Sequence, residues 1–296
     1  MIRKRIPLYP LFVWYIVGMF GLLLAGLSAG FGEVSDSIGK KEVHERVASY
    51  YTFGFLNLLF ATIFIIAAGL LRNDFIFSLA SLPTFIPRLF LEVVQAHISV
   101  LAIMKADRGD FGIIRILTVP LLLTVDISLG YHVTSFQMLG IVLISGTVMF
   151  LSYAERFKTK GLWLILASAV NAVITISLYK YDITHFNSVE AEQGIVSLVL
   201  LLYFFMLAVY VRRENPLRFL LKPAFVVQTA ASGLSYAAAS FAILFAPASI
   251  ITGALRAFAV LFSIISGRFY FREKGFLLKV TSFCVIALGL ACLALS

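Results

Sequence analysis

GLLLAGLSAGFGEVSDSIGK (residues 21–40) aligns without gaps with GLWLILASAVNAVITISLYK (residues 161–180), and the two segments share a leading glycine, a Ser-Ala pair and a closing lysine. The likeness continues along the chain at a nearly constant offset, with apolar segments in the same order. The other matched residues are Arg72 and Arg212, Ser99 and Ser240, Gly112 and Gly253, and Arg115 and Arg256. Because segment order and paired charges agree, we interpret the chain as a duplicated unit, with repeats at residues 1–158 and 159–296.

Apolar residues make up 61% of the chain and charged residues only 13%, and the mean hydropathy is +0.99. A soluble globular domain has about 25% charged residues, so this composition excludes a soluble protein and predicts an integral membrane protein. The apolar segments lack the two-residue alternation of barrel strands and are much longer than such strands. The predicted fold class is all-α, with ten transmembrane helices of about 20 residues each.

The predicted helices of the first repeat run from Leu11 to Gly39, Ser49 to Leu71, Pro83 to Met104, Gly109 to Gly130 and Ser135 to Tyr153. Those of the second repeat run from Leu162 to Tyr179, Gly194 to Val211, Leu217 to Phe245, Ala248 to Tyr270 and Phe276 to Ser296. An odd number of spans inverts the second repeat relative to the first across the bilayer. Inverted repeats are a recurring plan of secondary transporters, whose substrate site lies between the repeats near the membrane midplane.

The chain is expected to be a multi-pass protein of the cell membrane with an uncleaved first helix. Arg3, Lys4 and Arg5 resemble the basic start of a signal sequence, but the apolar run that follows is too long and has no small-residue cleavage site. Most loop Lys and Arg residues fall on the side opposite the termini. The positive-inside rule then places both termini outside the cytoplasm.

Arg115 and Arg256 are the strongest candidate site residues, because each interrupts an apolar helix at the same place in its repeat. A charged side chain at a helix centre costs roughly 2.5–3.5 kcal/mol even on insertion scales, which points to a functional role. Inverted symmetry would bring the two guanidinium groups together, where their planar donors suit a carboxylate or phosphate. The alternative for Arg115 is that its side chain reaches the interface beside the charged loop Lys105–Asp110, itself expected to be a solvated turn.

The third predicted span carries Arg88, Glu92, Gln95 and Ser99 on one helix face, at steps of four, three and four residues. Glu92 is expected either to form an internal ion pair with Arg88, or to take part in proton coupling or hold a substrate amine. Gln95 and its repeat counterpart Tyr236 are expected to line the substrate cavity.

The first predicted span ends with Glu33 and Asp36, which lie either at cavity depth or at an interfacial helix end. Asp36 is the second candidate for proton coupling. The matching sixth span offers Asn171 instead of an acidic pair, and Asn171 is a candidate polar contact for the substrate. The sequence has no nucleotide-binding loop and no metal-ligand cluster, so we predict no cofactor, no metal and no catalytic residue.

The chain resembles the drug/metabolite transporter superfamily of EamA-like ten-helix proteins. The resemblance rests on the helix order and on two matching segments, from Ile114 to Gly146 and from Ala254 to Gly289. In that family a proline-containing helix leads to a Leu-Gly-Glu-like turn and then to a glycine-containing helix. Glu273 keeps the turn carboxylate in the second repeat, whereas Tyr131 stands at that place in the first. The resemblance implies two inverted five-helix repeats and termini inside the cytoplasm, in conflict with the loop charges.

Within the superfamily, the distantly similar triose-phosphate and nucleotide-sugar transporter branches carry basic residues in the fourth and ninth spans that contact phosphate. Arg115 and Arg256 lie close to those places, so the resemblance implies an anionic group on the substrate. We therefore expect a secondary active transporter of a small organic metabolite, not an enzyme, that works in the lipid bilayer as a monomer or homodimer without binding nucleic acid. The alternatives are an exporter of amino acids or amphiphilic metabolites and a flippase for a phosphorylated lipid.

Overall fold

The computed structural model describes residues 11–128, 134–154, 159–242 and 248–294, which form α-helices joined by short turns. No strand occurs among these residues, so the all-α class is confirmed for this part of the chain. The helices are α1 (Leu11–His44), α2 (Tyr50–Arg72), α3 (Leu82–Lys105), α4 (Arg108–Arg115), α5 (Thr118–Ser128), α6 (Ser135–Ala154), α7 (Thr159–His185), α8 (Val189–Met206), α9 (Pro223–Ala242), α10 (Ala248–Phe269) and α11 (Phe276–Ala294). Two 3-10 turns, η1 (Leu79–Ser81) and η3 (Pro216–Leu221), and a π-helical turn, η2 (Leu207–Val211), connect or extend them.

The expected fourth span is not one helix but two, α4 and α5, so the described residues form eleven helices where ten were predicted. Pro120 explains the break, because it has no N–H to donate to the carbonyl of Ile116 and its ring clashes with that carbonyl in a regular helix. The Ile116 carbonyl instead accepts the N–H of Val119 at 2.9 Å, a tighter turn that separates the two helices.

Serine caps start two strongly apolar helices. The Ser49 hydroxyl accepts the N–H of Thr52 at 3.3 Å at the start of α2, and the Ser188 hydroxyl accepts the N–H of Ala191 at 3.2 Å at the start of α8. Each cap satisfies one of the amide donors that a helix start leaves without an intrahelical partner. Both helices therefore begin at a defined residue, directly after a capping serine.

Four helical segments among the described residues are long and apolar enough to cross a membrane. They are Tyr50–Arg72, Leu79–Lys105, Gly161–His185 and Val189–Val211, and shorter apolar helices cover Met138–Leu151 and Phe276–Cys292. Only 28% to 39% of the residues in the four spanning windows are buried inside the protein, so the majority of these residues are at least partly exposed. An apolar exterior of this extent is unfavourable in water and indicates a membrane protein.

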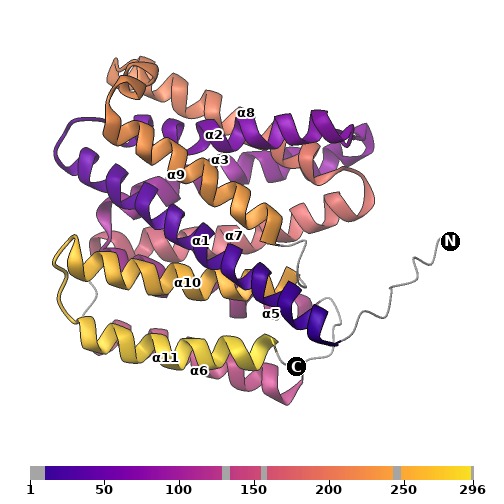
Figure 1. Ribbon diagram of the computed structural model, residues 1–296, viewed down its shortest axis with the longest axis vertical. Coiled ribbons are helices and arrows are strands. Elements are labelled where there is room, and N and C mark those ends of the chain that lie inside the picture. The colour runs from indigo at the N-terminus through magenta and orange to yellow at the C-terminus, as the bar shows by residue number, and fades with distance from the viewer. Residues whose placement is uncertain (1–10, 129–133, 155–158, 243–247, 295–296) are drawn as a thin grey trace.

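The helices are arranged in a row of layers (Figure 1). The α2–α8 pair lies at one end and the α6–α11 pair at the other, with α1, α9, α7, α3 and α10 between them. In this middle part α1 packs against α9 and α10, while α7 packs against α3 and also against α4 and α5. The arrangement surrounds the middle of α1 with three helices, α4, α9 and α10, that carry polar side chains.

Small residues let these middle helices approach closely. The hydroxyl of Ser28 donates to the carbonyl of Ser235 at 2.8 Å, and the hydroxyl of Ser235 donates to the carbonyl of Ser28 at 2.8 Å, which ties α1 to α9. A methyl group built on Gly112 of α4 would lie 2.0 Å from the hydroxyl oxygen of Ser263 on α10. The contact between α4 and α10 therefore depends on the missing side chain of Gly112.

Candidate functional site

A cavity of about 330 Å³ lies between α1, α4, α9 and α10. Its volume is within the usual range for small-molecule sites. Three serines and five charged residues contribute its polar groups. The serines are Ser28, Ser235 and Ser263, and the charged residues are Glu33, Asp36, Arg108, Arg115 and Arg256. Three arginines against two carboxylates leave one positive charge in excess, so the cavity favours an anion.

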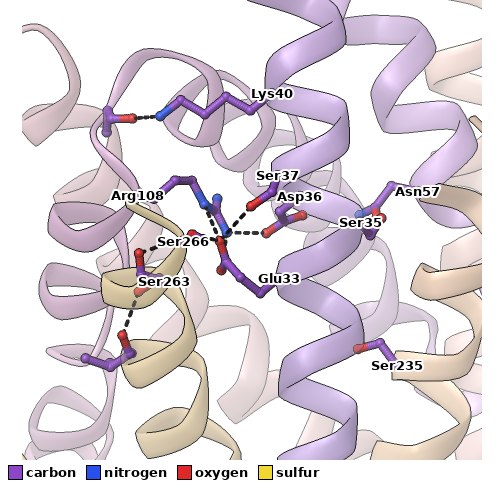
Figure 2. Close-up of polar contacts among 12 residues, drawn as sticks. Glu33, Ser35, Asp36, Ser37, Lys40, Asn57, Arg108, Ser235, Ser263 and Ser266 are labelled. Carbon is purple, nitrogen blue, oxygen red and sulfur yellow. Dashed lines mark hydrogen bonds and ion pairs between the residues drawn. The ribbon is translucent and has the colours of Figure 1, made fainter. Parts of the chain in front are cut away.

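Arg108 forms a bidentate ion pair with Glu33 (Figure 2). Its Nε donates to Oε1 of Glu33 at 3.0 Å, and its Nη2 donates to Oε2 at 2.6 Å and to Oδ2 of Asp36 at 3.0 Å. The Arg108 side chain is only 2% exposed, so both its charge and its donors require partners inside the protein. The planar guanidinium matches the carboxylate in the geometry that makes such pairs strongest.

The Glu33 carboxylate accepts several hydrogen bonds, whereas one donor nitrogen of Arg108 has no acceptor among the described residues. Oε1 of Glu33 also accepts the hydroxyl of Ser37 at 3.0 Å and the hydroxyl of Ser266 from α10. The buried Nη1 of Arg108, in contrast, has no hydrogen-bond partner in the part of the chain that the structure describes. Because Nη1 is also closed off from solvent, an anion could reach this donor only after a rearrangement of the cavity wall.

The turn after α10 holds the start of α4 in place. The Glu273 carboxylate accepts the backbone N–H of Arg108 and, at 3.1 Å, that of Gly109. A carboxylate at a helix N-terminus satisfies free amide donors and interacts favourably with the helix dipole. Lys279 of α11 lies 3.2 Å from the same carboxylate and 2.7 Å from Asp110, which joins α11 to this cap. The sequence-based interpretation of Lys105–Asp110 as a solvated turn is thus wrong for Arg108, which is buried by this network.

Arg115 and Arg256 reach the same cavity from α4 and α10, as the matched positions in the two repeats had suggested. The Arg115 guanidinium lies over the Phe111 ring, 5.4 Å from its centroid. Within the described ranges, neither arginine has an ion-pair partner. Asp36 on the same cavity attracts Arg115 without forming an ion pair with it, whereas Arg115 and Arg256 repel each other, and an anion between them would relieve that repulsion.

Glu33 and Asp36 lie on the cavity wall and not at the end of a helix, because α1 continues to His44. The Asp36 side chain is 20% exposed and contacts Arg108 from the cavity side. Figure 2 shows both carboxylates projecting from α1 toward Arg108, with Ser266 of α10 on the other side of Glu33. Asp36 would therefore compete with any anion that entered the cavity for the cationic groups.

A second cavity of about 320 Å³ contains two other candidate residues, Glu92 and Tyr236. Ser235 lines both cavities, so they adjoin at α9. The expected pair of Arg88 and Glu92 is present at 3.6 Å, and the fully buried Arg88 also pairs with the fully buried Glu192 of α8. Glu92 thus has an ion-pair partner and also faces a cavity, and the two alternatives considered for it are not exclusive.

Gln95 and Asn171 bond to each other and lie outside the arginine cavity. The Asn171 amide donates to the Gln95 side-chain oxygen at 2.9 Å, and the Gln95 amide donates to Ser168 at 2.7 Å and to Ser99 at 3.1 Å. These bonds fasten α3 to α7. The amide nitrogens of both residues and the side-chain oxygen of Gln95 are engaged in hydrogen bonds, including one from the Asn171 amide to the carbonyl of Leu91 at 2.9 Å.

The sequence interpretation missed Arg108, Glu273 and Lys279 as parts of the site. A signal for Arg108 was present, because Arg108, Gly112 and Arg115 follow the i, i+4, i+7 spacing of one helix face. No such signal exists for Lys279, whose partners come from a different helix and a turn. Comparison with protein-family models and with curated proteins found no match for this chain.

Proposed function

We propose that this protein is a secondary active transporter for a small organic metabolite that bears an anionic group. The observation that carries the proposal is the presence of Arg115 and Arg256 in one cavity without ion-pair partners among the described residues. The guanidinium group of arginine recognises carboxylate and phosphate oxygens through paired hydrogen bonds. Arg108 lines the same cavity, with its charge paired to Glu33 and Asp36.

The helix contacts support two inverted repeats of five helices, residues 1–158 and 159–296, with α4 and α5 together as the fourth span. Under this assignment α1 corresponds to α7, and α9 and α10 correspond to α3 and to the α4–α5 unit. α1 packs against α9 and α10, and α7 packs against α3, α4 and α5, so equivalent pairs make equivalent contacts. The pairs α2–α8, α6–α11 and α4–α10 would lie on the pseudo-two-fold axis. This plan is typical of secondary transporters. Together with the matched segments of the sequence, it favours membership of the drug/metabolite transporter superfamily. It also favours a multi-pass protein of the cell membrane.

In this proposal Arg115 and Arg256 bind the anionic group of the substrate. The ion pair between Asp36 and Arg108 breaks as the substrate enters. Asp36 and Glu92 are the proposed proton-coupling groups, because each faces one of the two adjoining cavities and has an arginine beside it. Tyr236 contributes a polar contact in the second cavity. Gln95 and Asn171 act on the site through the α3–α7 contact.

The serine shared by the two cavities suggests the path between them. Ser235 lines both and bonds to Ser28 across the α1–α9 contact. Rocking of one repeat against the other would open this contact and connect the cavities in turn, as alternating access requires. Coupling to an ion gradient would supply the energy for transport. The protein would work as a monomer or homodimer in the bilayer.

Counterflow into proteoliposomes tests the proposal. The purified protein is reconstituted and loaded with unlabelled solute, and uptake of labelled solutes is compared in pairs that differ only in an anionic group, such as glycerol 3-phosphate and glycerol. We expect protein-dependent counterflow for anionic members only. Equal counterflow of the uncharged members, or of zwitterionic amino acids, would favour the exporter function with structural arginines and would reject the anion site.

A further inference from the structure

A groove of about 850 Å³ runs between α1 and α10 and shares a wall with the arginine cavity. Its lining is almost wholly apolar, and several of its side chains are exposed at the surface. Examples are Leu23, Leu27, Val34, Ile265 and Phe269, of which Phe269 is 75% exposed. In a membrane-spanning chain such a surface faces hydrocarbon rather than water.

The partition between groove and cavity is thin. On α1, Gly26 and Gly30 have no side chains, and the rings of Phe258 and Phe262 on α10 lie 3.6 Å from where their Cβ atoms would be. The two rings are stacked, with centroids 6.5 Å apart. Further along the same contact the Ser266 hydroxyl bonds to Glu33, the one charged residue that lines both spaces. Joining the groove to the cavity would therefore require α1 and α10 to separate at this contact, with displacement of the two rings and loss of the Ser266–Glu33 hydrogen bond.

The groove has the length of a lipid chain. Its lining on α1 extends from Leu22 to Ile38, which at 1.5 Å per residue is about 24 Å. One leaflet of the hydrocarbon core is about 15 Å thick, half of roughly 30 Å. A single acyl chain that lies along α1 and α10 therefore fits within the groove.

We propose that the groove binds the hydrocarbon chain of an amphiphilic anion that enters from the bilayer, with its anionic headgroup directed through the α1–α10 contact to Arg115 and Arg256. This inference rests on the proposed anion site and deepens it by naming the substrate class. The charge complementarity is specific, because the apolar groove adjoins the cavity whose excess charge is positive. A lipid with a zwitterionic headgroup has no net negative charge that would attract it to this cavity.

Photolabelling tests this assignment. The protein is placed in phosphatidylcholine nanodiscs with lysophosphatidic acid that carries a photoreactive diazirine on its acyl chain, and labelled residues are mapped by mass spectrometry. The same chain on lysophosphatidylcholine is the matched control probe. We expect the anionic probe to label Leu27, Val34 and Phe262 at least about fivefold more than the control probe does, and unlabelled lysophosphatidic acid to suppress this labelling.

Two variants sharpen the test. Leu27→Trp fills the groove, whereas Leu202→Trp on α8 changes a leucine of nearly the same exposure, 55% against 54%, outside it. Only Leu27→Trp is expected to remove the headgroup-dependent labelling. Equal labelling by both probes, or labelling unchanged in Leu27→Trp, would overturn the groove assignment. Binding of radiolabelled glycerol 3-phosphate, which has no chain, separates the two claims, because it depends on Arg256 if the anion site is correct and is independent of Leu27.

Discussion

Arg108 and Glu33 join α4 to α1 through two parallel hydrogen bonds, 3.0 Å from Nε to Oε1 and 2.6 Å from Nη2 to Oε2. The pair stands where the apolar groove and the arginine cavity meet, since Glu33 lines both spaces. It neutralises the charge of Arg108, so that Arg115 and Arg256 are the proposed anion-binding groups of the cavity. The same pair fixes the position of α4, on which Arg115 depends.

Loss of the Glu33 carboxylate should destabilise the protein. Glu33→Gln leaves the buried Arg108 with only Asp36 as a counter-ion, and removing one partner of a buried pair costs roughly 3 kcal/mol. The measurement is the midpoint of thermal unfolding in detergent. Glu45→Gln, at an exposed position after α1, is the matched control and should leave the midpoint unchanged. Equal midpoints for the two variants would show that the pair contributes no stability.

Two glutamates on α8, two residues apart, should differ sharply. Glu192 and its partner Arg88 are fully buried, whereas Glu190 pairs at 3.3 Å with Arg72, whose side chain is 63% exposed. Glu192→Gln is expected to cost roughly 3–5 kcal/mol of stability, because it leaves a buried cation with a weaker partner. Glu190→Gln should cost less, about 1 kcal/mol, because Arg72 remains solvated when the carboxylate is lost, although the Glu190 side chain itself is only 11% exposed. Unfolding in denaturant measures both, and a larger loss for Glu190→Gln would contradict the assigned burial.

The glycines matched between the two proposed repeats, Gly112 and Gly253, should respond differently to alanine. A Cβ on Gly112 would meet Ser263 at 2.0 Å, while none of the described residues has an atom within 4 Å of a Cβ on Gly253. Gly112→Ala should therefore push α4 from α10 and lower stability by about 1–3 kcal/mol. Gly253→Ala should be neutral or stabilise α10 by up to about 1 kcal/mol, because alanine favours helix. Thermal unfolding of the two variants distinguishes these outcomes, and a stable Gly112→Ala would mean that the helices lie farther apart.

The sequence was sufficient for features that depend on local pattern. Helical periodicity and composition predicted the all-α class, and the matched positions of Arg115 and Arg256 predicted that they would come together. The face shared by Gln95 and Ser99 was also predictable, and the two side chains bond at 3.1 Å.

Features that depend on distant partners were not predictable in this way. Arg108 looked like part of a solvated turn because its partners, Glu33 and Glu273, lie far away in the sequence. Asn171 and Gln95 were predicted to contact the substrate because an apolar segment does not show which polar side chains bond to each other.

The break before Pro120 could have been predicted from the sequence, since proline disrupts a helix at the preceding turn.

The most direct test of the central claim is the dependence of anion transport on Arg256. Arg256→Ala removes a cation from the cavity, and Arg268→Ala removes an exposed cation from the same helix. Counterflow of radiolabelled anionic solute is measured in proteoliposomes that contain equal amounts of folded protein. We predict a loss of at least about tenfold for Arg256→Ala, since a hydrogen bond to a charged group is worth roughly 1.5–3 kcal/mol, and no change for Arg268→Ala. Unchanged counterflow of every anionic solute in Arg256→Ala would contradict the account.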